Sequence, residues 1–464
     1  MTTKINYITS VMIAGILSLL AAIPISCEKF VETDFPTNQI PSELVFEDEQ
    51  TAEAALAGLY SNLWNNSMIS GGIDGTGALL GTYSDDLNCV YTSPSNGVLD
   101  LYNNQQIATN TAVSSLWTYA YQQIYTANSI MEGVKNSKSL SVSVRDRIRG
   151  EALFVRSLLY MYLYQIFDEI PYTDTTNYIT NSQLGRMPKD QLLQKIENDL
   201  SEAVTLLPAA YRNAERIYPN KYAGYMALAK MKMLLKKWSE AEVLCGIIMQ
   251  NSLYAYQPDI TKVFQKGGSH IIWQLKPKNN NDATKEAALY TFTGAPVSFV
   301  LSSDVVNSFT AGDLRRQNYI VAVPFGTQVN YRPAKYKNLS VNNPTEYSVI
   351  FRLDETYLMQ AENLIEQSRV SEAVPFINKS RQRAGVPALT TSITSAEAWI
   401  QLREEKRREF LTEHGIRFFD LKRWGMLDQL QSTKPNWKTF HSRWPLPQKE
   451  LLLNPKLNPQ NTGY

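Results

Sequence analysis

Two copies of one helical hairpin constrain the fold of this chain more than any other feature. The tripeptide Ser-Glu-Ala occurs at 239–241 and again at 371–373, and in each copy its alanine follows another alanine by twelve residues, at Ala229 and Ala361. A helix-forming segment (YMALAKMKMLL or TYLMQAENLIE) comes first, then a short turn and a second helix that ends near a proline. Hairpins of this kind bury their apolar faces by stacking on one another. The chain must therefore contain paired, packed helices.

The hairpin pattern resembles the tetratricopeptide repeat, in which small alanines allow close helix crossing. Two further pairs are predicted, one within residues 144–207 and one joining 49–64 with 113–135. From Val144 to Ile166, apolar residues recur at steps of three or four behind Ser143 as a candidate N-cap, and Pro208 stops the partner helix. The two tripeptides lie 132 residues apart, so this is not a strict tandem array. We predict a mainly α fold.

The helical pattern fails in two segments, near 70–110 and 256–347. Glycine, proline and asparagine break them into loops and short β pieces such as 270–275 (HIIWQL). Long irregular segments inside a helical body usually have a function. Both contain several tyrosines, and a tryptophan stands just before the first (Trp64) and within the second (Trp273). The flat faces of these rings stack on the CH faces of sugar rings, while Asp and Asn accept hydrogen bonds from hydroxyls. The candidate ligand-binding residues are Trp64, Asp74, Tyr83, Asp85, Asp86, Tyr91, Tyr102, Trp273, Tyr290, Phe292 and Tyr331. For each one alone, core packing or helix capping is the alternative.

The amino-terminal segment has the pattern of an export signal. An apolar run at 11–25 follows a short polar start, and it falls short of the ~20 residues that span a bilayer. It ends in Pro-Ile-Ser before Cys27, which resembles the lipobox of bacterial lipoproteins. We predict a signal peptide at 1–26, a lipidated Cys27 and an extended tether at 27–48, with cleavage of an ordinary signal peptide nearby as the alternative. Cys89 and Cys245 are predicted to be unpaired.

Composition and motifs exclude several classes of function. The 45 Lys and Arg balance the 44 Asp and Glu at a net charge of +1, so no field attracts nucleic acid. The three histidines lie far apart and form no local metal motif. Adjacent acids at 85–86 and 168–169 do not suit glycoside hydrolysis, which needs carboxylates ~5–9.5 Å apart across a substrate. The glycine run at 71–77 matches no phosphate-binding motif. We predict no catalytic residue, metal ligand or cofactor.

Five segments in the same order resemble those of one family of outer-membrane lipoproteins, the SusD/RagB family. They are 54–60 (AALAGLY), 304–315 (DVVNSF and GDLR), 352–362 (RLDETYLMQAE), 407–425 (RREFLTEHGIRFFDLKRWG) and 444–461 (WPLP and NPKLNPQN). The resemblance therefore covers nearly the whole mature chain. Ligand residues in the family lie outside these motifs, so none is carried over by position.

The resemblance implies a SusD-like fold, with tetratricopeptide hairpins as scaffold and loops that carry the ligand site. The expected division is an N-terminal helical part at 49–255 and a C-terminal part at 256–464. The expected function is to bind nutrient oligomers, mainly oligosaccharides, at the outer membrane facing the cell exterior. The expected partner is a SusC-like TonB-dependent transporter, and the membrane contact is the lipid anchor.

Two rival functions remain, a RagB-like peptide binder and a tetratricopeptide adaptor that binds only proteins. The charged run at 403–409, together with Asp420, Arg423 and Trp424, could form a basic contact surface. However, Glu404 and Arg408 stand at i and i+4 in the favourable order, and such arrays usually bridge neighbouring helices. We predict a structural role for them.

Overall fold

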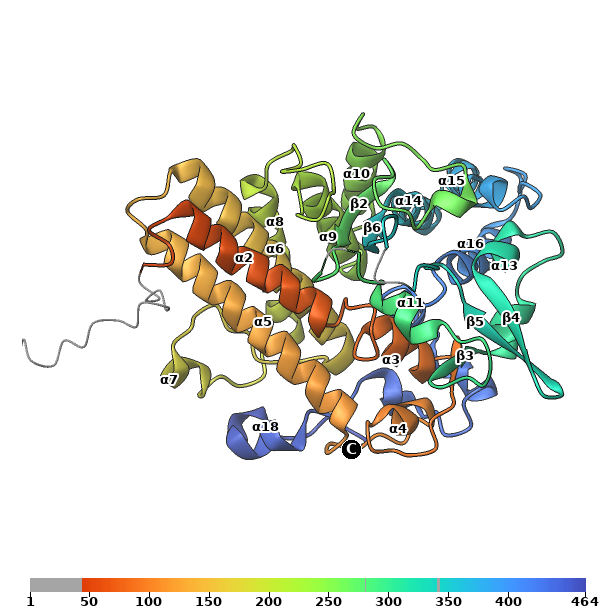
Figure 1. Cartoon of the computed structure of the whole chain (residues 1–464), viewed down its shortest axis with the longest axis horizontal. Helices are drawn as coiled ribbons and strands as arrows, with labels where there is room; N and C mark the ends of the chain where they lie inside the picture. The colour runs from red at the N-terminus through yellow and green to blue at the C-terminus, as the bar shows by residue number, and fades with distance from the viewer. Residues whose placement is uncertain (1–43, 280, 340–342) are drawn as a thin grey trace, which may run out of the picture. The chain divides into compact units, whose positions relative to one another are not determined.

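The computed structural model describes residues 44–279, 281–339 and 343–464 (Figure 1). The predicted signal peptide, the predicted lipidation site Cys27 and most of the tether lie outside the described residues. Within the described ranges, no helix combines the length and apolar character needed to cross a bilayer. The mainly α prediction is confirmed.

Four long helices form the first layer: α2 (Glu49–Asn65), α5 (Thr111–Asn136), α6 (Val142–Phe167) and α8 (Lys189–Leu206). They pack in the order α2, α5, α6, α8 (Figure 1). The α6 N-cap is Ser141, whose hydroxyl accepts a hydrogen bond from the Val144 amide, so the helix begins earlier than the Ser143 prediction. The predicted stop before Pro208 is correct, because α8 ends at Leu206.

Both predicted hairpins are present and adjacent. The first is α9 (Lys221–Leu234) with α10 (Trp238–Met249), and the second is α14 (Leu353–Glu366) with α15 (Val370–Arg383). Ala229, Ala241, Ala361 and Ala373 have no exposed surface, which confirms that small residues allow the close crossings. Helix α10 packs against α14, so the two copies form one stack. Cys245 lies buried in this stack, and like Cys89 it is a free thiol, as predicted.

The charged run belongs to a buried ion network beside the second hairpin. Helix α16 (Ser395–Glu409) carries part of the run, and α17 (Ile416–Arg423) follows it. The network consists of Asp313, Arg315, Lys335, Arg352, Asp354, Arg383, Glu405, Glu409 and Glu413. All of these side chains are buried. Of the run itself, Glu405 and Glu409 belong to this network, and Lys406 pairs with Glu362 and Asp420. Arg423 pairs with Asp420. The predicted structural role is confirmed for these residues.

Short elements fill the loop-rich part. The strands form three antiparallel pairs, β1 (Leu87–Cys89) with β3 (Phe299–Leu301), β2 (Ile271–Leu275) with β6 (Ser348–Arg352), and β4 (Ile320–Phe325) with β5 (Gln328–Pro333). The short helices are α3 (Thr76–Tyr83), α4 (Val98–Tyr102), α7 (Tyr178–Asn181), α11 (Lys285–Tyr290), α12 (Ser303–Asn307), α13 (Leu314–Asn318) and α18 (Gln448–Leu453). The 3-10 turns are η2 (Ile260–Lys262), η3 (Leu427–Ser432), η4 (Thr439–Ser442) and η5 (Pro455–Leu457).

The closing segment, residues 444–464, packs against the first helical layer. The Trp444 amide donates to the carbonyl of Ile166 over 2.8 Å, and the Asn461 side chain donates to the carbonyl of Phe167 over 3.0 Å. The Trp444 ring has no exposed surface. The end of the chain thus completes the core around the end of α6. The division at residue 255 stays a prediction.

Candidate ligand-binding site

The two irregular segments meet in space, which the sequence analysis did not predict. Strands β1 and β3 pair, with Asn88 opposite Val300, and the Ser302 amide donates to the carbonyl of Asp86 over 2.9 Å. The loop before α3 presses against α11, because a Cβ at Gly71 would lie 1.9 Å from the Glu286 carboxyl carbon. A larger residue at position 71 would have to displace the Glu286 carboxylate.

Trp64, Asp74 and Lys285 share the rim of this junction, and we call them the Trp64 surface. All three are only partly exposed. The Lys285 Nζ lies 4.9 Å from the centre of the Trp64 ring, a cation–π contact, and it donates a hydrogen bond to the carbonyl of Asn65. The buried Trp64 Nε1 has no hydrogen-bond partner among the described residues. An aromatic face, a carboxylate and an ammonium group therefore lie together.

Burial moves the two charges of the Trp64 surface toward neutrality. It raises the pKa of Asp74, an effect that Lys285 opposes, and it lowers the pKa of Lys285, which Asp74 and Glu286 oppose. Both groups are therefore partly removed from water and rely on each other. Such groups suit hydrogen bonding to a neutral, hydroxyl-rich ligand.

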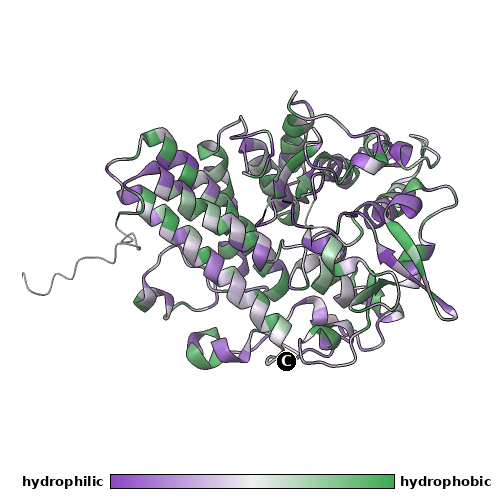
Figure 2. Ribbon diagram, in the orientation of Figure 1, coloured by the Kyte–Doolittle hydropathy of each residue, from purple (hydrophilic) through white to green (hydrophobic). Residues whose placement is uncertain are grey.

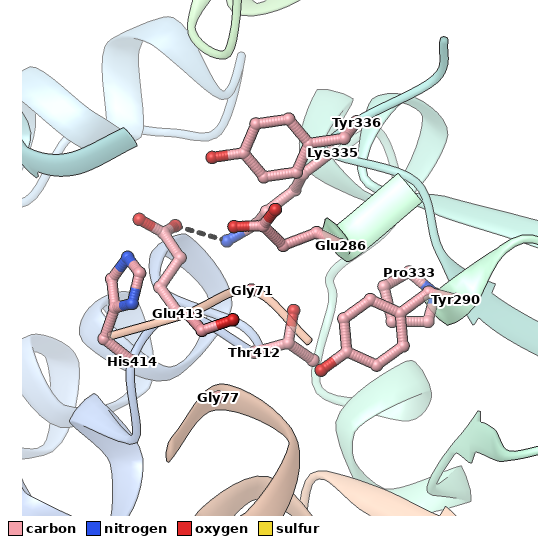
Figure 3. Close-up of a pocket in the computed structure, with 11 residues that line it drawn as sticks. Gly71, Gly77, Glu286, Tyr290, Pro333, Lys335, Tyr336, Thr412, Glu413 and His414 are labelled. Atoms are coloured by element: carbon pink, nitrogen blue, oxygen red, sulfur yellow. Dashed lines mark hydrogen bonds and ion pairs between the residues drawn. The ribbon is translucent and has the colours of Figure 1, made fainter. Parts of the chain in front are cut away.

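Figure 3 shows a small pocket beneath this junction, lined by Glu286, Tyr290, Lys335, Glu413 and His414 among others. The Glu286 carboxylate accepts from the Ser348 hydroxyl over 2.7 Å, and burial raises its pKa to about 7. The Lys335 Nζ donates to Glu413 over 2.5 Å, and burial lowers the pKa of this lysine to about 8. The cavity holds about 20 Å³, room for about one water molecule and not for a sugar ring.

Four predicted ligand-binding aromatics belong to the core instead, and the prediction for them is wrong. Tyr83 and Trp273 have no exposed surface, while Tyr290 and Phe292 expose 4% and 7%. The Tyr83 hydroxyl donates to the carbonyl of His441 over 3.0 Å. The Trp273 Nε1 donates to the carbonyl of Ile217 over 3.2 Å. Backbone carbonyls thus satisfy the polar ends of Tyr83 and Trp273, so the richness in Tyr and Trp reflects core packing as well as surface chemistry.

Asp85 and Asp86 hold helices together, which also contradicts the ligand-binding prediction for them. Arg417 donates to both Asp85 oxygens, over 3.0 and 2.9 Å, and Arg407 lies 3.3 Å from Asp86. Burial raises the pKa of Asp85, but the hydrogen bond from Arg417 and the charges of Arg417 and Arg407 outweigh it, so the pKa is lowered. Asp85 is therefore an anchor for α16 and α17.

Replacing Asp85 by asparagine should lower the free energy of unfolding by about 1–3 kcal/mol at pH 7, because Arg417 loses a charged, bidentate acceptor. A lowered folded-state pKa adds stability above the unfolded-state value, and this is lost as the pH falls through the folded value. The deficit of Asp85→Asn should therefore shrink in acid. Urea denaturation at pH 7 and pH 3 measures both effects.

The matched control is Asp174→Asn, because Asp174 is exposed. It should change stability little at either pH. Equal stability of the two variants at pH 7 would contradict the anchoring role of Asp85.

The three remaining predicted residues reach solvent at other places. Tyr91 contacts the ring of Phe299 edge-on at 6.0 Å. Tyr102 lies under Lys434, whose Nζ is 4.0 Å from its ring centre, and Tyr331 lies under Arg316 at 4.8 Å. A cationic group thus lies over one face of two of these rings, as Lys285 does over Trp64.

Lys285 was missed from the sequence, since a single lysine at the start of a short helix carries no pattern. Its role becomes visible only through its contact with Trp64, 221 residues earlier in the chain.

Two family models match the chain. Residues 21–233 match the model described as "Starch-binding associating with outer membrane", and residues 325–442 match the model of the SusD family. A SusD-like protein of Formosa agariphila is 26% identical over 516 residues, which cover 95% of this chain and 97% of that protein.

Solved structures show the same fold. A SusD superfamily protein from Bacteroides vulgatus superposes with a TM-score of 0.79 at 22% identity, covering 90% of this chain and 100% of that one. A laminarin-binding SusD-like protein gives 0.77 at 20% identity, with the same coverage of both chains. Surface glycan-binding protein A from Bacteroides thetaiotaomicron, in complex with laminarihexaose, gives 0.74 at 18% identity and covers 89% of this chain and 99% of that one.

Proposed function

Because this chain belongs to the SusD/RagB family, we propose that it binds nutrient oligosaccharides at the outer membrane, without cleaving them, and passes them to a SusC-like transporter. The family description names starch, and two of the similar structures are of proteins that bind laminarin or laminarihexaose. These ligands are neutral glucans, which fixes the first probes for an experiment.

The observation that carries the proposal is the Trp64 surface. A tryptophan face provides stacking area for one sugar ring, and the Asp74 carboxylate and Lys285 ammonium beside it can accept from and donate to hydroxyl groups. The three side chains come from two segments that the strand pair β1–β3 holds together. The site is thus supported by packed structure on both sides.

The ion pairs formed by the adjacent acidic residues at 85–86 and 168–169 support binding without cleavage. Asp85 and Asp86 are occupied by arginines, and Asp168 forms ion pairs with Lys422 and Arg443 at 2.9 and 3.2 Å. A hydrolase needs one carboxyl group free to give a proton and another facing it across the substrate. The predicted lipid on Cys27 would hold the protein at the membrane.

Replacing Trp64 by alanine should weaken binding of laminarihexaose or maltohexaose by about tenfold, because a stacked aromatic face contributes about 1 kcal/mol or more. Isothermal titration calorimetry on residues 28–464 measures the change. The sugar should be recovered uncleaved after the titration.

The matched control is Trp238→Ala, since Trp238 is also partly exposed but lies at the start of α10. Equal affinities for the two variants would contradict a role of Trp64 in binding. If mixed peptides give heat and neither hexasaccharide does, the peptide-binding alternative replaces the glycan proposal. If neither class binds, and native membranes yield only protein partners, the adaptor function is favoured.

A further inference from the structure

A groove of about 760 Å³ lies on the other side of the first helical layer. Its floor is α5, one wall is the segment 171–184 with α7, and the other wall is α18 with the residues up to Leu457. Figure 1 shows α7 and α18 beside α5. Its size falls in the range of pockets that enclose small organic ligands, about 300–1,000 Å³.

The groove faces away from the Trp64 surface. Gln123 of α5 donates to the carbonyls of Asn62 and Asn66 at the end of α2, over 3.3 and 2.6 Å. The groove is lined instead by Tyr121 and Tyr125 from the same turns of α5. The two surfaces are therefore separated by the thickness of α5.

An aromatic stripe runs along the floor. Trp117, Tyr121 and Tyr125 follow one another at intervals of four residues, which places them on one face at about 6 Å per step. Exposure rises along the stripe from 3% at Trp117 to 54% at Tyr125. Tyr178 lines the opposite wall and is 82% exposed. Trp117 thus forms the buried end of the stripe, and successive rings of a ligand lying along α5 would meet Tyr121 and Tyr125.

The floor and walls are held in place before any ligand arrives. The Tyr121 hydroxyl donates to the carbonyl of Pro171 over 2.7 Å, and the Trp117 ring stands edge-on to Phe167 at 5.1 Å. The Asn454 side chain donates to the carbonyl of Leu184 over 2.7 Å, which joins the two walls. A preformed site binds with less loss of conformational entropy than a flexible one.

The chemistry of the lining fits a neutral sugar. Between the aromatic rings stand hydroxyl and amide groups, among them Thr118, Gln122 and Asn181, and the wall of α18 contributes the carboxylate of Glu450. Lysine and arginine are absent from the described lining, so the groove does not favour sulfated or acidic polymers. Hydrophobic residues of α18, green in Figure 2, form the rim, where Leu453 is 69% exposed.

We propose that this groove is a second carbohydrate-binding site, which takes a linear neutral oligosaccharide along α5 by stacking on Tyr121, Tyr125 and Tyr178. This second proposal depends on the proposed function only in taking the ligand to be a carbohydrate. Two separated sites on one protein would hold a long polysaccharide at two points and raise its effective concentration at each.

The experiment is a calorimetric titration of residues 28–464 with laminarihexaose, maltohexaose, cellohexaose and mannohexaose. Four proteins are compared: the unchanged protein, Tyr125→Ala/Tyr178→Ala, Trp64→Ala/Asp74→Asn, and the combination of all four substitutions. The unchanged protein should bind two molecules of one hexasaccharide, each double variant should lose one site or weaken it at least tenfold, and the combination should bind none. Tyr119→Ala, on α5 but outside the groove lining, is the matched control and should bind as the unchanged protein does.

The outcomes separate the two proposals. If Tyr125→Ala/Tyr178→Ala binds as the unchanged protein does, the groove inference is overturned and the Trp64 proposal stands. If only that variant loses binding, the groove stands and the Trp64 proposal fails. If no hexasaccharide binds, or if mixed peptides compete for the groove, the assignment of the groove to carbohydrate is overturned.

A second measurement reports on the groove alone. Trp117 forms its floor, so a bound sugar should change the fluorescence of the unchanged protein, and Trp117→Phe should remove that part of the signal while it keeps the binding heat. A signal unaffected by Trp117→Phe would also count against the inference.

Discussion

Replacing Arg352 by methionine should lower the free energy of unfolding by about 3–5 kcal/mol at pH 7, because it removes one positive charge from among three buried carboxylates. Arg352 donates to Glu409 over 2.8 Å and to both oxygens of Glu413 over 3.0 and 2.8 Å. It also lies 3.1 Å from Asp354. Methionine fills much of the volume but neutralises none of these charges.

The pH dependence of this loss has a definite sign. Burial raises the pKa of Glu413, but Arg352 and Lys335 outweigh it, so the folded-state pKa is lowered. Such a group adds stability above the unfolded-state pKa, and this is lost as the pH falls through the folded-state value. The deficit of Arg352→Met should therefore be largest near neutral pH and smaller in acid.

Urea denaturation followed by circular dichroism, at pH 7 and pH 4, measures both effects. The matched control is Arg149→Met, because the Arg149–Glu202 pair is exposed by 43% and 42%. Exposed pairs contribute about 0–1 kcal/mol. A loss for Arg352→Met as small as that of the control would mean that the network does not stabilise the fold.

Replacing Trp273 by alanine should cost about 3–5 kcal/mol of stability, the usual range for removing a large aromatic side chain from a core. The Trp273 ring is fully buried on β2. Its centre lies 5.2 Å from the ring centre of Phe154 and 5.9 Å from that of Phe351. Because no part of it reaches solvent, the affinity for a hexasaccharide should not change at temperatures where the variant is folded.

Chemical denaturation and calorimetry on the same samples decide between core and ligand roles for Trp273. Trp273→Phe keeps part of the packing and should lose less stability than Trp273→Ala. If Trp273→Ala kept its stability and lost hexasaccharide binding, our assignment of this residue to the core would be wrong.

The helices could be predicted because the relevant signal is local. Apolar periodicity and Pro208 located α6 and α8, and the repeated alanines located two hairpins whose crossings leave no alanine surface exposed. The predicted N-cap of α6, Ser143, lies two residues after the observed one. Ser141 and Ser143 are equally good caps in the sequence, and only the tertiary structure selects Ser141.

The site was less predictable because its contacts join distant parts of the chain. Asp85 meets Arg417, 332 residues later, and nothing near Asp85 in the sequence reports this arginine. Tyrosine and tryptophan are ambiguous, because a buried carbonyl satisfies their polar ends as well as a ligand does. Trp64 stands among polar residues and Trp273 in an apolar run, and only Trp64 reaches the surface.

The floor of the groove could be predicted from the sequence. Trp117, Tyr121 and Tyr125 share one helical face, and such spacing can be recognised from sequence alone. The walls of the groove could not be predicted, because they come from 171–184 and from α18, about 270 residues apart in the chain. In the sequence alone, the aromatic stripe of α5 cannot be distinguished from the buried face of an ordinary helix.

The contacts of the closing segment make the first helical layer depend on the last residues of the chain. Trp444 and Asn461 cover the end of α6, so the packing of that helix is complete only when residues 444–464 are in place. A chain cut short before Trp444 would therefore expose this end of the core to solvent.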